Sequence, residues 1–122
     1  MDTEKRLENE FKEFISQDEL PYYLYIHDRD GVFTYVSPNV TDLLGFTVQE
    51  FKDFYLNYAT ANPLNKEMIR YTQQALKGIQ QEPYKVEVYD KEYMTQLLCV
   101  YERPVFKDEQ VVGIEGVAKL LN

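Results

Sequence analysis

The sequence of 122 residues has no tryptophan, one cysteine (Cys99) and one histidine (His27). A single cysteine excludes an intramolecular disulfide framework and favours a reducing compartment. A single histidine excludes any nucleophile–base pair that draws on a second imidazole. No two carboxylates are placed by the sequence on one face with an obvious substrate cleft. These absences count against an enzyme.

Basic residues are also few, with 13 Lys and Arg against 21 Asp and Glu, for a formal net charge of -8. Nucleic acid and anionic membrane surfaces reward clustered basic residues, so neither is expected as a partner. No apolar run approaches membrane-spanning length, and the charged N-terminus lacks an apolar signal core. We therefore expect one cytoplasmic domain, without direct membrane insertion, that could belong to a larger membrane-anchored protein.

The chain is 44% hydrophobic and contains 11 tyrosines, which is enough for a folded core in one domain. The segment 22–46 carries the clearest local signals. Asp30-Gly31 is a tight-turn dipeptide between two strand-like runs, so residues 22–28 and 32–36 are expected to form a hairpin. Ser37-Pro38 then favours the start of a short helix that ends at Gly45.

Periodicity predicts the remaining elements. Residues 2–17 form an amphipathic helix with one apolar stripe, broken at Leu20-Pro21. Thr47 with Glu50 makes a capping box for a second short helix. The longest helix is expected over residues 63–78, and strands over residues 84–90, 94–104 and 111–120.

The order of these parts resembles a PAS domain, the sensory box of signalling proteins. The resemblance covers residues 20–120 and implies an α+β fold: a PAS-like five-stranded antiparallel sheet with helices on one face and an N-terminal flanking helix. The first strand should be central in the sheet, beside the last. Residues 1–19 would be the amphipathic flanking helix and residues 20–122 the sensor domain. The motifs that carry the resemblance are Asp28-Arg29-Asp30-Gly31, Tyr35-Val36-Ser37-Pro38, Leu43-Leu44-Gly45-Phe46 and the segments 103–106 and 112–117.

The resemblance implies a non-catalytic sensory or interaction module in two-component or cyclic-di-GMP signalling. It would regulate a downstream output domain, a histidine kinase or a diguanylate cyclase, by small-ligand binding and rearrangement of a homodimer. One alternative is a pure dimerisation module with a filled core and no ligand. Another, less favoured, is a small enzyme that uses Cys99 or His27.

A ligand site is expected between the sheet and the helix 63–78. In the first strand, Leu24 and Ile26 are assigned to the core. Gly116 and Ala118 are small residues on one strand face, which would leave volume for a ligand, although close helix–sheet packing explains them equally well. The predicted lining is Ile26, Leu44, Tyr58, Met68, Thr72, Val88, Gln96, Leu98, Gly116 and Ala118.

No cofactor or metal is expected. The helix 63–78 contains no histidine to ligate haem, and the cysteine motif of flavin-adduct PAS relatives is missing. Asp28 and Asp30 suit a turn better than a metal site. The apolar stripe of the N-terminal helix is expected to contact a second copy of the chain, with the chain's own sheet as the other possible cover. Its residues are Leu7, Phe11, Phe14 and Ile15.

Overall fold

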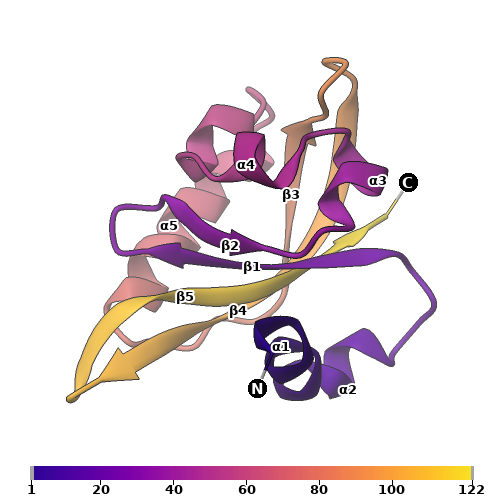
Figure 1. Ribbon diagram of the computed structural model, residues 1–122. Helices are drawn as coiled ribbons and strands as arrows, with labels where there is room; N and C mark the ends of the chain where they lie inside the picture. Colours follow the sequence, from indigo (N-terminus) through magenta and orange to yellow (C-terminus); the bar gives the residue numbers. More distant parts are fainter. Residues whose placement is uncertain (1, 122) are drawn as a thin grey trace.

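The computed structural model describes residues 2–121 as one five-stranded sheet with helices on both sides (Figure 1). Alternating apolar residues form the strands, and segments with apolar residues at helical spacing form the helices. The strands are β1 (Tyr22–Asp28), β2 (Phe33–Val36), β3 (Tyr84–Tyr89), β4 (Thr95–Lys107) and β5 (Gln110–Leu120). The helices are α1 (Thr3–Glu10), α2 (Lys12–Ile15), α3 (Val40–Leu44), α4 (Val48–Phe51), the 3-10 helix η1 (Tyr55–Tyr58) and α5 (Leu64–Leu76).

The strand order is β2-β1-β5-β4-β3, and every neighbouring pair is antiparallel. This confirms the predicted five-stranded antiparallel sheet with the first strand beside the last, although β5 rather than β1 is the central strand. We call the face covered by α3, α4, η1 and α5 the inner face, and the face covered by α1 and α2 the outer face (Figure 1).

Most predicted turns and caps form as the local sequence indicates. The Asp28 carboxylate accepts hydrogen bonds from the backbone N–H groups of Asp30 and Val32, which makes it a turn-forming residue. Gly45 ends α3 with φ 85°, a backbone region that glycine adopts without steric cost. Thr47 and Glu50 form the predicted capping box of α4. Ser37, predicted as a helix cap, instead accepts the backbone N–H of β1 at Leu24.

The N-terminal segment differs from the single helix predicted over residues 2–17. The chain leaves helical geometry at Phe11, with φ -105° and ψ 18°, so α1 and α2 are separate helices. The break lets both helices turn their apolar side chains onto the outer face. Leu7, Phe11 and Phe14 pack there against Leu24 and Val117, with Ile15 partly buried beside them. The stripe predicted to contact a second copy is thus covered within the chain, because the outer face of the sheet offers it an apolar surface.

The first strand is also turned over relative to the prediction. Tyr23 and Tyr25 point to the inner face, while Leu24 and Ile26 pack with the outer cluster beneath α1 and α2. Alternation separates the two faces of a strand, but it does not say which layer will cover each face. Here both faces are covered, so hydrophobicity alone could not assign them.

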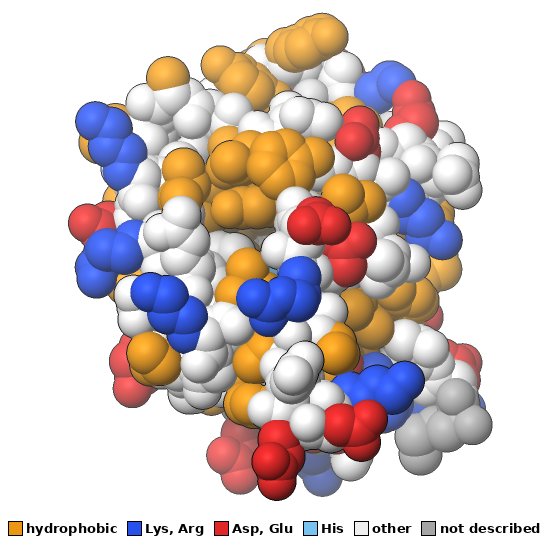
Figure 2. All heavy atoms as spheres, turned by 90° about the vertical axis from the view of Figure 1, so that its left-hand side faces the viewer, with side chains coloured by type: hydrophobic (Ala, Val, Ile, Leu, Met, Phe, Trp, Pro, Cys, Tyr) orange, Lys and Arg blue, Asp and Glu red, His pale blue; other side chains and the backbone are white. Residues whose placement is uncertain are grey.

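Part of the apolar surface stays exposed. Figure 2 shows hydrophobic side chains gathered over the middle of one side of the molecule, with Lys, Arg, Asp and Glu around them. The exposed large hydrophobic residues include Ile79, Phe106 and Val112. No helix within residues 2–121 is long and apolar enough to cross a membrane.

Candidate functional site

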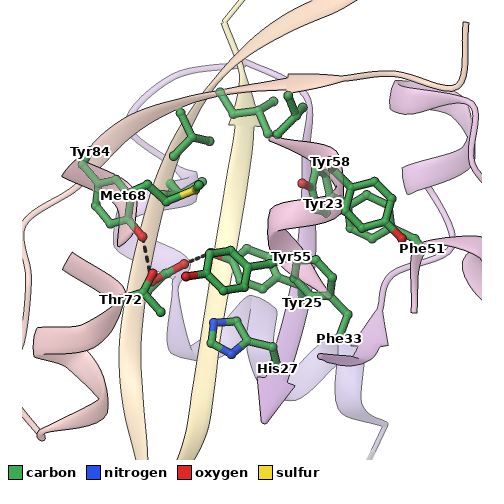
Figure 3. Close-up of a pocket in the computed structure, with 15 residues that line it drawn as sticks. Tyr23, Tyr25, His27, Phe33, Phe51, Tyr55, Tyr58, Met68, Thr72 and Tyr84 are labelled. Carbon is green, nitrogen blue, oxygen red and sulfur yellow. Dashed lines mark hydrogen bonds between the residues drawn. The ribbon is translucent and has the colours of Figure 1, made fainter. Parts of the chain in front are cut away.

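A cavity of ≈ 40 Å³ lies between the inner face of the sheet and helix α5 (Figure 3). A water molecule takes about 30 Å³ in the liquid, so the space suits a group of very few heavy atoms. Its walls are mostly aromatic and contain no Lys or Arg. The lining residues are Tyr23, Tyr25, His27, Phe33, Phe51, Tyr55, Tyr58, Met68, Thr72, Tyr84, Val86, Val88, Leu98, Val100 and Glu102.

The charged residue in this lining is Glu102 on β4, only 7% exposed. Strand pairing explains how its carboxylate is satisfied. Tyr25 on β1 pairs with Gly116 on β5, and Gly116 pairs with Glu102 on β4, so the three form one row across the sheet. Because Gly116 has no side chain, the Tyr25 ring lies over it and the phenol donates a hydrogen bond to Glu102. A Cβ at position 116 would lie 2.5 Å from the Tyr25 hydroxyl.

A second phenol completes the arrangement. Tyr84 on β3 donates to the other carboxylate oxygen of Glu102 at 2.9 Å. Burial raises the pKa of both Tyr25 and Tyr84 well above the ordinary value, and the nearby Glu102 charge raises it further. Both phenols therefore stay protonated at neutral pH and act as donors to the carboxylate. No ion pair joins Glu102 to a Lys, Arg or His of residues 2–121.

His27 forms another wall of the cavity. Its ring stacks between the rings of Tyr25 and Tyr55, with centroid separations of 6.4 Å and 5.6 Å. Its Nδ1 lies 2.8 Å from the carbonyl oxygen of Asp28. A carbonyl oxygen only accepts hydrogen bonds, so Nδ1 carries the proton and the tautomer is fixed by the backbone.

The cavity sits between the sheet and the longest helix of a known fold. No protein-family model and no curated protein matches the sequence. Among solved structures, the PAS domain of a protein from Colwellia psychrerythraea superimposes with a TM-score of 0.70 at 14% identity, covering 95% of this chain and 97% of that one. This chain has the PAS fold. The result confirms the resemblance inferred from the motifs.

Other PAS-fold structures belong to signalling proteins. The N-terminal domain of a diguanylate cyclase with a PAS/PAC sensor from Marinobacter aquaeolei has a TM-score of 0.72 at 12% identity, covering 83% of this chain and 95% of that one. A blue-light activated histidine kinase from Erythrobacter litoralis has a TM-score of 0.69 at 13% identity, covering 84% of this chain. The match spans 34% of the kinase's own length.

Half of the predicted site residues line the cavity of this PAS fold, namely Tyr58, Met68, Thr72, Val88 and Leu98. The other five do not. Ile26 lies on the outer face, as described above. Leu44 is buried in the inner core away from the cavity. Gln96 sits at the start of β4, where its side-chain amide donates to Asp90 at 3.0 Å.

Gly116 and Ala118 face inward as predicted, but they do not leave the expected space. They pair with Tyr25 and Tyr23 of β1, whose rings occupy the volume above the sheet. Gly116 thus makes room for the Tyr25 ring, whose hydroxyl reaches Glu102 on the next strand.

Some of the missed lining residues, those of β3 and β4, share a strand face with residues that were predicted. On β3, Tyr84 and Val86 lie on the same face as Val88, and Lys85 lies on the other face. In the same way, Glu102 shares one face of β4 with Leu98 and Val100. A glutamate at an inward position was the available signal for the site.

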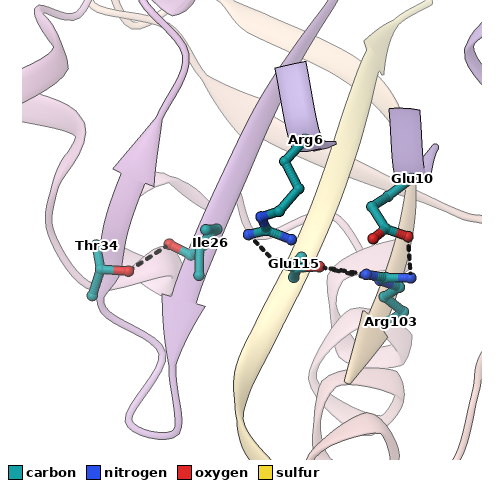
Figure 4. A network of polar contacts seen from close by, with 6 residues as sticks. All are labelled: Arg6, Glu10, Ile26, Thr34, Arg103 and Glu115. Carbon is teal, nitrogen blue, oxygen red and sulfur yellow. Dashed lines mark hydrogen bonds and ion pairs between the residues drawn. The ribbon is translucent and has the colours of Figure 1, made fainter. Parts of the chain in front are cut away.

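The outer face carries a second polar cluster (Figure 4). Glu115 on β5, whose side chain is 3% exposed, accepts from Arg6 of α1 at 2.6 Å and from Arg103 of β4 at 2.9 Å. Arg103 also pairs with Glu10 of α1 at 2.7 Å. Burial opposes ionisation of Glu115, but the two arginines outweigh it and lower its pKa. This cluster fastens α1 to the sheet.

Within residues 2–121, no group of three or more His, Cys, Asp or Glu side chains is arranged to hold a metal ion. Cys99 belongs to the outer cluster, on the far side of the sheet from the cavity. Burial raises the pKa of its thiol. A raised pKa lowers the fraction of reactive thiolate at neutral pH.

Proposed function

We propose that this chain is a non-catalytic PAS sensory module that binds a small ligand in the tyrosine-lined cavity and regulates an attached output domain. The fold is that of sensor domains in histidine kinases and diguanylate cyclases. The observation that carries the ligand part is Glu102, a buried carboxylate that lines the cavity and forms no ion pair within residues 2–121. Buried charges that serve only packing are normally paired.

The structure offers a route from the cavity to the N-terminal helices. Glu102 and Arg103 are neighbours on β4 and point to opposite faces of the sheet. Arg103 binds Glu10 of α1 and Glu115 of β5. A ligand that shifts Glu102 would therefore move the residue that fastens α1. We propose that this movement changes the position of α1 and α2 relative to the sheet, and through it the geometry of a homodimer.

The proposed homodimer cannot use the predicted stripe while α1 and α2 lie on the sheet, because Phe11 is only 2% exposed and Leu7 is fully buried. It needs either another surface or release of these helices. Release would expose the stripe and couple dimer geometry to the cavity directly. The dimer remains a prediction, as does the cytoplasmic location inferred from cysteine usage.

One observation favours the alternative of a dimerisation module with a filled core. A volume of ≈ 40 Å³ is far below the roughly 300–1,000 Å³ of typical small-molecule sites. In this alternative the cavity holds only water, bound to Glu102 and its phenol donors. The enzyme alternative finds less support, since Cys99 lies away from the cavity and His27 is held in a ring stack.

The same geometry supports the proposal that no haem or flavin adduct is involved. Helix α5 carries no histidine, and Cys99 could not reach a flavin in the cavity from the outer face. Thr72 on α5, Glu102 on β4 and Tyr84 on β3 are among the cavity residues that combine polarity with burial. They suit a small polar ligand better than a large planar cofactor.

Native mass spectrometry of the purified chain, followed by hydrogen exchange of α1 and α2, tests the proposed function. We expect a retained or added small molecule that changes exchange at the backbone amides of both helices. Val100→Phe, which would fill the cavity from β4, should abolish both effects, and Lys12→Ala, an exposed position on α2, should not. A ligand-free mass with no response to any added compound would support the filled-core alternative.

A further inference from the structure

We infer that the cavity selects a small organic ammonium cation, with its charge on Glu102 and its alkyl part against the tyrosine rings. This inference rests on the proposed function and names the chemical class of its ligand. Three independent features lead to it: the charge of the lining, the chemistry of the walls and the size of the space.

The charge of the lining favours a cation. Glu102 has about four lone-pair positions on its two carboxylate oxygens. Tyr25 and Tyr84 each donate one hydrogen bond, to different oxygens, which leaves further acceptor capacity. No Lys or Arg lines the cavity. A primary ammonium has three N–H donors and would neutralise the carboxylate, whereas an anion would meet its charge directly.

The walls favour an organic cation over a metal ion. Most of the residues that line the cavity are aromatic, among them Phe33, Tyr25 and Tyr55. The electron-rich faces of such rings attract ammonium groups, and their apolar surface accepts alkyl groups. Alkali and alkaline-earth ions instead need a shell of carboxylate, carbonyl or water oxygens, of which the side chains of the lining supply only the Glu102 carboxylate, besides neutral hydroxyls.

The size of the space sets the size of the cation. A volume of ≈ 40 Å³ accommodates an ion on the scale of methylammonium. A larger quaternary ion such as tetramethylammonium would require η1 or α5 to move from the sheet. Thr72 and Met68 of α5 form part of the cavity wall, so a larger ion would displace helix α5 (Figure 3).

NMR titration of the whole chain with methylammonium chloride tests the inference, with methanol, sodium formate and potassium chloride as matched neutral, anionic and inorganic probes. We expect saturable shifts at cavity residues with methylammonium alone. Glu102→Gln keeps an acceptor for the phenols and removes the charge, and should weaken binding at least tenfold. Tyr84→Phe removes one donor and leaves the charge, and should bind methylammonium as tightly as the parent or more tightly.

Each contrary result has its own meaning. Equal binding of methylammonium by the parent and Glu102→Gln would overturn the cation inference. Preferential binding of methanol or formate would overturn it as well, while leaving a ligand-binding PAS module in place. A lack of saturable shifts with all four probes would overturn it and would also favour the filled-core alternative. If Glu102→Gln does not fold, the comparison of parent and Tyr84→Phe across the probes decides.

Discussion

The two faces of the sheet solve the same problem of burying charge in different ways. On the outer face, Glu115 is buried beneath α1 and is held by two arginines, Arg6 and Arg103. On the inner face, Glu102 is buried to a similar extent and is held by two neutral phenols. The outer carboxylate is neutralised by the chain itself. The inner one is hydrogen-bonded to neutral donors and forms no ion pair within residues 2–121.

This difference separates a structural cluster from a candidate site. Breaking a buried ion pair leaves an unpaired charge, so the outer cluster fastens α1 to the sheet as long as its ion pairs are intact. A carboxylate with neutral partners can accept a further positive group without losing any existing contact. Glu102 of the inner face and Arg103 of the outer face are consecutive residues of β4. The two polar clusters are therefore linked by a single peptide bond.

The largest expected loss of stability comes from a substitution on the outer face. Phe11→Ala removes a nearly fully buried ring from the contact between the N-terminal segment and the sheet, where it meets Tyr101 at a centroid distance of 5.8 Å. We expect a loss of roughly 3–5 kcal/mol in the free energy of unfolding, measured by urea denaturation. Lys12→Ala, at the adjacent exposed position, should change it by less than about 0.5 kcal/mol.

The oligomeric state of the same samples shows whether the apolar stripe of α1 and α2 packs on the chain's own sheet or on a second copy of the chain. If Phe11→Ala dissociates a dimer while the unfolding free energy of the monomer is unchanged, then the stripe serves a second copy and the arrangement on the outer face is wrong.

The next effect disturbs the inner face at Gly116. A Cβ there would lie 2.5 Å from Cζ of Tyr25, so Gly116→Ala must displace the ring that reaches Glu102. We expect a loss of roughly 1–3 kcal/mol, as for other overpacked cores, again by urea denaturation. In the background of Tyr25→Leu, which removes the ring, the same substitution should cost much less. Equal losses in both backgrounds would mean that the ring and the glycine are not coupled.

A pH experiment sharpens the contrast between the two carboxylates. The pKa of Glu115 in the fold lies below its ordinary value of 4.5 because of Arg6 and Arg103. The ionised form therefore stabilises the fold above about pH 4.5, and this contribution is lost as pH falls through the lowered pKa. Glu115→Gln should be less stable than the parent at pH 7 by roughly 1–3 kcal/mol.

The difference between Glu115→Gln and the parent should shrink as the pH is lowered to about 3, measured by denaturation at each pH. A difference that is constant over this range would mean that the charge of Glu115 contributes nothing and that only its shape matters.

The smallest expected effect concerns an ion pair outside both faces. On α5, Nε of Arg70 donates to a carboxylate oxygen of Glu67 at 2.9 Å, and both side chains are more than half exposed. Exposed pairs of this kind contribute little because water and salt screen them. Arg70→Ala should leave the thermal midpoint unchanged within experimental error. A clear drop would show that charge pairing stabilises this molecule in general, which would weaken the contrast drawn between Glu102 and Glu115.

Local chemistry was sufficient for much of the fold. The turn at Asp30-Gly31 and the capping box at Thr47 and Glu50 were predictable because each depends on a few adjacent residues. The end of β4 was not, since the strand runs to Lys107 and not to residue 104. Alternation also identified correctly which residues of β3 and β4 share a face, and hence that Val88 and Leu98 line the cavity.

The tertiary structure alone decided how these faces are used. Residues of β1 are apolar on both sides, and only the positions of α1 and α5 determine that Tyr25 turns inward and Ile26 outward. Gly116 gains its role from strand register, which sets it between Tyr25 and Glu102, residues far apart in the chain. The amino-acid pattern fixed which side chains lie together on a strand. Contacts between distant segments determined that two phenols and one carboxylate meet above a glycine, because cross-strand pairing and layer order are set by the packing of the whole domain.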